Sequence, residues 1–213
     1  MSTSTQIAVV VGSTRPTRIG PRIATWLLSI LESELAVSHA RYSIVDIAQF
    51  NLPSFSEPIA PRFVEDLDQF ANLATRSWNK EIAKYDAYII LSPEYHQSIP
   101  GALKNAIDLV FHAWSGKAVL IVTYGIFGGA YASQQVRQIL GGGVGMKVVD
   151  IAPELEFPGR DELKNNTSQA LFQAMKGSVA NETLNLWEAT NREDIIEGTK
   201  ELLKLTNPAS EPF

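Results

Sequence analysis

Residues 7–20 read IAVVVGSTRPTRIG, a run of branched aliphatic side chains that ends at Gly12 and leads into a polar loop. A continuous apolar run of this kind is typical of a strand buried on both faces of a parallel sheet. Helical spacing follows over Pro21–Leu35, where one apolar stripe holds Ile23, Trp26, Leu27, Ile30 and Leu31. The chain is therefore expected to begin with a strand, a loop and a helix.

The same alternation continues along the chain. Further strands are expected at Tyr42–Ile47, Tyr88–Leu91, Val119–Tyr124 and Val144–Ile151. Helices are expected at Phe63–Lys84, Ile99–Val110, Ala130–Leu140 and Thr183–Leu205. Residues 51–61 are expected to be loop, and residues 152–181 mostly irregular, with a short helix within Leu163–Met175. The pattern predicts an α/β fold with five parallel strands and helices on both faces, in one domain over residues 1–213 with an insertion at 152–181.

The composition of the chain argues against several classes of function. The chain has 213 residues, a net charge of -5, 45% hydrophobic residues and no cysteine. Disulfides and thiolate metal sites are excluded, and the negative charge argues against a nucleic-acid surface. The chain has no apolar run near the roughly 20 residues of a membrane span and no signal-peptide pattern, so we expect a cytoplasmic protein with no membrane partner.

Ligands of open parallel sheets bind at the carboxyl ends of strands, where the strand order reverses. The loop after the first strand leads into a helix and carries Gly12, Ser13, Thr14, Arg15, Thr17, Arg18 and Ile19. Main-chain N–H groups, hydroxyls and two guanidinium groups at a helix N-terminus suit a phosphate dianion. The loop has neither a Walker pattern nor a dinucleotide G-x-G-x-x-G pattern. An ordinary polar turn with two solvated arginines is the alternative.

Two later loops are expected at the same carboxyl edge of the sheet. The loop after the third strand holds Pro93, Glu94, Tyr95, His96, Gln97 and Ser98, stiffened by Pro93 and Pro100, and its N–H groups can line a flat heterocycle. Tyr95 is interpreted as a ring contact or as packing, and His96 as an acid/base or as a solvated side chain. The loop after the fourth strand holds Tyr124, Gly125, Gly128 and Gly129, which favours either close approach of the backbone to a ligand or a tight turn.

Together these motifs resemble the NADPH-dependent FMN reductases. The resemblance covers residues 6–151 well and rests on Gly12–Arg15 with Arg18, Ser92–Tyr95 with Ser98–Asp108, and Tyr124-Gly125 with Gly128-Gly129. It implies a flavodoxin-like three-layer sandwich with strand order 2-1-3-4-5. It also implies that the first loop binds the phosphate of FMN and that the other two loops hold the flavin ring. The family usually has asparagine where this chain has His96.

The resemblance further implies a hydride donor, NADPH or NADH, with NADPH favoured, and a small-molecule electron acceptor such as a flavin or a quinone. A ping-pong reaction at bound FMN needs no catalytic side chain, since the flavin carries the chemistry. Members of the family are commonly homodimers or homotetramers. The rival hypothesis is a flavodoxin-type electron carrier or a flavin-dependent regulatory protein.

Other functions have less support. A hydrolase lacks its G-x-S-x-G pattern, and the scattered His39, His96 and His112 predict no metal site. The tryptophans at 26, 78 and 187 are expected in the core or at an interface rather than on a cofactor, and Trp114 is open to either role.

Overall fold

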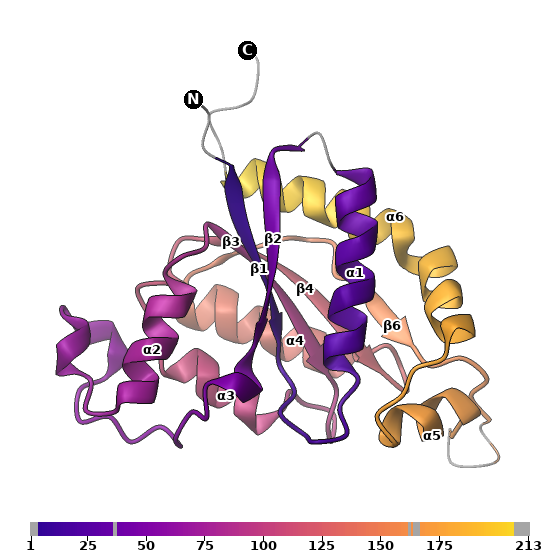
Figure 1. Ribbon diagram of the computed structural model, residues 1–213, viewed down its shortest axis with the longest axis horizontal. Coiled ribbons are helices and arrows are strands. Elements are labelled where there is room, and N and C mark those ends of the chain that lie inside the picture. Colours follow the sequence, from indigo (N-terminus) through magenta and orange to yellow (C-terminus); the bar gives the residue numbers. More distant parts are fainter. Residues whose placement is uncertain (1–3, 36–37, 162, 164–166, 207–213) are drawn as a thin grey trace.

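The central parallel sheet has the predicted strand order. The computed structural model describes residues 4–35, 38–161, 163 and 167–206 (Figure 1). The strands lie in the order β2-β1-β3-β4-β5. Their bounds are Thr5–Val11 for β1, Ala40–Asp46 for β2, Ala87–Pro93 for β3, Ala118–Gly125 for β4 and Lys147–Val148 for β5. All of these pairings are parallel, so the carboxyl ends of the strands share one edge.

Helices cover both faces of the sheet (Figure 1). The helices α1 (Gly20–Glu34) and α6 (Asn181–Thr206) pack on one face, and α2 (Leu73–Ile82), α3 (Gly101–Asp108) and α4 (Ala130–Arg137) pack on the other. Trp26 and Trp187 are buried in the first core, and Trp78 and Trp114 in the second. The tryptophans therefore stabilise the packing of this chain, Trp114 included.

The fifth strand differs from the prediction of Val144–Ile151. The helix α4 runs on into a π-helix, η5 (Gln138–Val144), which ends at Gly145 with φ 81°. The strand therefore starts later, and β5 pairs with β4 only at Ala118 and Val119. A second piece, β6 (Glu154–Glu156), pairs with the other end of β4, from Thr123 to Gly125. The region expected to be mostly irregular thus supplies a strand next to the carboxyl edge.

The single helix predicted over Phe63–Lys84 is wrong in its first part. Two 3₁₀ turns, η3 (Pro61–Phe63) and η4 (Leu67–Gln69), precede α2. The side chain of Asp66 accepts the N–H of Asp68, and that of Asn72 accepts the N–H of Ala74. Such local acceptors end and restart helical turns, which the apolar spacing alone does not register.

Two short elements complete the fold. A 3₁₀ turn, η2 (Ile47–Gln49), follows β2, and α5 (Gln169–Met175) lies between β6 and α6. The helix α5 begins after Ser168, whose hydroxyl accepts the N–H of Leu171. Within the described ranges, none of the helices is long and apolar enough to cross a membrane.

Candidate functional site at the carboxyl edge of the sheet

The three loops selected from the sequence meet at one edge. Since β3 lies between β1 and β4, the loops that follow these strands are neighbours. The N–H of Gly12 donates to the carbonyl of Leu91 at 2.9 Å, and the N–H of Glu94 to that of Tyr124 at 3.0 Å. The hydroxyls of Ser13 and Tyr95 hydrogen-bond at 2.8 Å. Direct hydrogen bonds therefore tie the first loop to the second and the second to the third.

The first loop offers free main-chain donors. Residues 14–17 are exposed, and the N–H groups of Ser13, Thr14, Arg15 and Thr17 donate to nothing among the residues that the structure describes. A side chain on Gly12 would bring Cβ to 2.9 Å from Cδ2 of Leu103 and to 3.2 Å from the carbonyl of Leu91. Glycine at this position therefore lets the loop lie close to α3 and β3.

The two arginines of the first loop have different surroundings. Nη2 of Arg18 lies 2.6 Å from Oδ2 of Asp46, and their side chains are only 19% and 10% exposed. Nη1 of Arg18 donates to the carbonyl of Arg15 at 3.3 Å, while its buried Nε has no partner within the described chain. Arg18 therefore braces the loop from inside, and its charge is balanced by Asp46.

Arg15 has no such partner carboxylate. Its Nη2 donates to two carbonyls, those of Thr17 at 3.1 Å and Ala174 at 3.3 Å. No carboxylate of the described residues forms an ion pair with it. The positive charge that remains at this loop is therefore mainly that of Arg15.

The second loop is a tight turn. Tyr95 and Ser98 exchange two main-chain hydrogen bonds, of 2.9 and 3.0 Å, while His96 and Gln97 have φ values of 52° and 57°. This is the arrangement of a two-residue hairpin turn of type I′. Two adjacent non-glycine residues in the left-handed region cost about 1–3 kcal/mol each, strain that is typical of ligand sites.

Contacts with α4 fix the orientation of this turn. The hydroxyl of Ser98 donates to Oε1 of Gln135 at 2.6 Å, and Nε2 of Gln135 donates to the carbonyl of Gln97 at 3.2 Å. The carboxylate of Glu94 accepts the N–H groups of Tyr131 and Ala132, at 2.9 and 3.3 Å. Glu94 therefore caps the N-terminus of α4, so its carboxylate already has two donors.

The left-handed backbone at His96 leads to a first prediction. Asparagine and histidine both occur at positive φ far more often than β-branched residues. We expect His96→Asn to keep the melting temperature, and His96→Val to lower stability by about 1–3 kcal/mol. Thermal unfolding of the two variants checks this. Equal melting temperatures for the asparagine and valine variants would contradict the role assigned to the turn.

The third loop needs its glycines for contacts within the protein. At Gly128, φ 69°, a Cβ would lie 2.7 Å from Cβ of Glu154. At Gly129, φ 88°, it would lie 2.8 Å from Cβ of Thr123. A Cβ on Gly125 would lie 3.2 Å from the nitrogen of Gly129. The N–H of Gly128 donates to the carbonyl of Gly125 at 3.3 Å. These contacts favour the tight turn as the reason for the glycines.

A cavity of about 200 Å³ lies where the loops meet. The loops contribute Arg15, Arg18, Ile19, Pro93, Glu94, Tyr95, Tyr124, Gly125 and Ile126. Burial raises the pKa of Tyr124 far above its ordinary value, although the nearby Arg15 and Arg18 oppose the shift. The Tyr124 phenol therefore stays neutral. The opposite wall comes from the region after β6, which the sequence did not place at the site: Phe157, Leu171, Ala174 and Met175.

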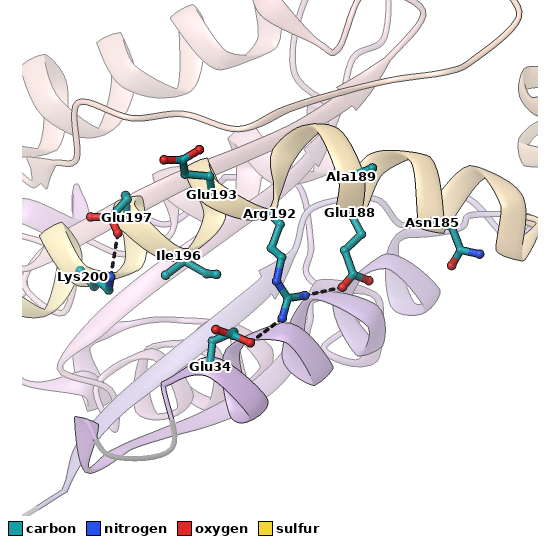
Figure 2. Close-up of a pocket in the computed structure, with 9 residues that line it drawn as sticks. All are labelled: Glu34, Asn185, Glu188, Ala189, Arg192, Glu193, Ile196, Glu197 and Lys200. Carbon is teal, nitrogen blue, oxygen red and sulfur yellow. Dashed lines mark hydrogen bonds and ion pairs between the residues drawn. The ribbon is translucent and has the colours of Figure 1, made fainter.

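A second hollow lies far from these loops. It measures about 820 Å³, lies between α1 and α6, and is shown in Figure 2. Arg192 pairs there with Glu34 at 2.5 Å and also with Glu188, and Lys200 pairs with Glu197 at 2.7 Å. Most of its charges are thus paired, with Glu193 outside these pairs, and none of the three loops reaches it. The described residues also hold no cluster of metal-binding side chains.

A parallel sheet of this order, with a donor-rich loop after β1, defines a flavodoxin-like protein. The chain belongs to the NADPH-dependent FMN reductase family, whose sequence pattern matches residues 5–153. Members of this family are oxidoreductases, so the chain is an oxidoreductase with FMN and NAD(P)H as its expected cofactors. The family resemblance inferred from the motifs is confirmed.

Individual relatives agree with this assignment. An NAD(P)H-dependent FMN reductase from Nectria sp is 34% identical over 204 residues, which are 93% of this chain and 97% of the relative. An NAD(P)H-dependent FMN reductase from Saccharomyces cerevisiae is 30% identical, over 75% of this chain and 93% of that protein. A quinone reductase from Pseudomonas putida is 38% identical, over 66% of this chain and 72% of that protein.

The solved structures support the fold. The NAD(P)H:(acceptor) oxidoreductase from Paracoccus denitrificans superposes with a TM-score of 0.61 at 22% identity, covering 92% of this chain and 98% of that one. An oxidoreductase from Corynebacterium diphtheriae superposes with a TM-score of 0.62 at 13% identity, covering 98% of this chain and 100% of that one. The predicted flavodoxin-like sandwich is thereby confirmed.

Proposed function

We propose that the chain oxidises NAD(P)H at bound FMN and reduces a flavin, a quinone or a related small molecule in a ping-pong reaction. The relatives named as FMN and quinone reductases support these acceptors. The donor gives up two electrons and one proton as a hydride, and a quinone takes two electrons and two protons, the second proton from solvent. FMN, when bound, would accept the hydride from NAD(P)H and would then pass it to the acceptor.

The residues at the carboxyl edge fit FMN. The observation that carries the proposal is the cluster of free N–H donors on the first loop beside Arg15, whose charge no described carboxylate balances. We assign the phosphate to this loop, from Gly12 to Ile19. The ring edge would follow the second loop, from Pro93 to Ser98, and the third, through Tyr124, Gly125, Gly128 and Gly129. In that position the neutral Tyr124 phenol lies at the cavity as a hydrogen-bond donor.

The size of the cavity supports a ping-pong order. Small-molecule sites usually measure about 300–1,000 Å³. The cavity here measures about 200 Å³. The phosphate end of FMN would therefore extend onto the exposed residues of the first loop. Little room remains beside the ring, so the pyridine nucleotide and the acceptor would have to occupy the same place in turn.

Initial-rate kinetics test this order. With FMN-loaded protein, we expect double-reciprocal plots against NADPH to be parallel at different fixed quinone concentrations. Intersecting lines would require both substrates to be bound together and would contradict a shared place. Negligible NAD(P)H oxidation by FMN-loaded protein would instead favour the alternative function, an electron carrier or a regulatory flavin protein.

We also propose that the chain assembles as a homodimer or homotetramer. A groove of about 980 Å³ lies over α3, α4 and η5, with Phe55, Phe111 and Val144 among its lining residues. Aromatic side chains such as those of Phe55 and Phe111 are enriched at protein–protein interfaces. Trp114 is buried within the chain and so lies outside such a surface.

A further inference from the structure

The helix α5 forms one wall of the cavity. Figure 1 shows α5 beyond the carboxyl ends of the strands, on the same side as the first loop. Three of its side chains line the cavity, namely Leu171, Ala174 and Met175. Phe172 is not among the lining residues and is 48% exposed on the same helix. The helix therefore has one face at the cavity and another in solvent.

The helix α5 is attached directly to the first loop. The Ala174 carbonyl accepts Nη2 of Arg15 at 3.3 Å. Behind the helix, Gly177 has φ 85°, and a Cβ there would lie 3.4 Å from Cα of Thr17. Phe157 extends the same wall and packs on Trp187 with ring centroids 5.5 Å apart. The wall is thus held at a fixed place relative to the loop that we assign to the phosphate.

The two sides of the cavity differ in chemistry. The α5 side presents only apolar side chains, those of Leu171, Ala174 and Met175. The side formed by the loops is mixed, with charged and phenolic side chains beside apolar ones: Arg15, Arg18, Glu94, Tyr95, Tyr124, Ile19, Pro93 and Ile126. A flat ring that lies along the loops has the α5 side chains opposite it. A molecule that stacks on the α5 face of that ring would lie between the ring and the side chains of Leu171 and Met175.

We propose that Leu171 and Met175 determine which acceptors react, because they form the wall against which an acceptor must fit over the flavin. The inference rests on the proposed function, since it requires the flavin at this cavity. A one-ring quinone needs less of this space than a two-ring quinone. In an apolar pocket, a difference of one methylene group between two substrates changes their relative kcat/KM by about 10- to 200-fold.

The test uses FMN-loaded protein and two quinones, 1,4-benzoquinone and 2-methyl-1,4-naphthoquinone. Met175→Ala and Leu171→Ala should raise the ratio of kcat/KM for the two-ring over the one-ring quinone, by about ten-fold. Met175→Phe should lower that ratio. Met175 is 54% exposed, so its replacement leaves the core intact. Phe172→Ala is the matched control and should leave the ratio within two-fold.

A measurement without turnover accompanies the kinetics. The dissociation constant of 2-methyl-1,4-naphthoquinone from the oxidised, FMN-loaded protein follows from the change in the flavin absorption band, with no reductant present. It should fall in the two alanine variants and stay constant in Phe172→Ala. Unchanged ratios and unchanged dissociation constants in all cavity variants, with FMN bound, would overturn the inference. Failure to bind FMN at all would overturn the proposed function and this inference with it.

Discussion

Arg15→Ala is expected to weaken FMN binding by about 10- to 100-fold, the loss of one or two hydrogen bonds from a charged group. Arg15 is the cation of the first loop that no described carboxylate balances, and it stands among free N–H donors. Only the contribution of the phosphate to binding should be lost, so the affinity for riboflavin should stay constant. Titration of the apoprotein with FMN and with riboflavin, followed by quenching of flavin fluorescence, checks this, because riboflavin lacks the phosphate.

Arg22→Ala is the matched control for this variant. Arg22 is exposed in the first turn of α1, outside the loop, and donates to the side chain of Asn181 at 3.1 Å. Its loss should change FMN affinity less than about three-fold, as expected for a screened surface charge. If Arg15→Ala weakened riboflavin as much as FMN, or if Arg22→Ala matched it, the phosphate would not lie at this loop.

Gly129→Ala is expected to destabilise the folded protein by about 2–4 kcal/mol, a combination of left-handed strain and overlap. The new Cβ would lie 2.8 Å from Cβ of Thr123 and 3.1 Å from the nitrogen of Tyr124, atoms of a central strand that cannot easily move. The melting temperature should fall by roughly 5–15 °C. Because this loop borders the cavity, we expect FMN affinity to fall as well.

Gly142→Ala separates this effect from a general cost of replacing glycine. Beyond its chain neighbours and the backbone of its own helix, a Cβ on Gly142 in η5 would meet no heavy atom of the described residues within 4 Å. Alanine should therefore be neutral there or raise stability by about 0.5–1 kcal/mol. Similar melting temperatures for the Gly129 and Gly142 variants would show that the contact between the third loop and β4 is not a tight one.

The sheet was predictable because its signals are local. Apolar runs such as Ile7–Val11 are long enough to identify buried strands, and the loops that follow them reach one edge in any parallel sheet. Local patterns were therefore enough to locate the three loops of the candidate site. The break of the fifth strand into β5 and β6 was not predictable in this way, because it depends on how far the helical turns of η5 continue beyond α4, through Gly141–Gly143.

The contacts that complete the site depend on tertiary structure. Asp46 was not selected from the sequence, yet it pairs with Arg18, which lies 28 residues earlier in the chain. Ala174 accepts a hydrogen bond from Arg15 across 159 residues. No spacing rule links positions so far apart. A short helix was expected within Leu163–Met175, but its place over the cavity could come only from the folded chain.

The most direct test of the proposed reductase activity is the visible absorption spectrum of the purified protein, recorded after incubation with FMN and again after NADPH is added without oxygen. We expect a bound-flavin spectrum that bleaches rapidly when NADPH is added. A protein that binds FMN but stays oxidised would contradict the proposed reductase activity. A protein that binds no flavin would contradict the assignment of all three loops.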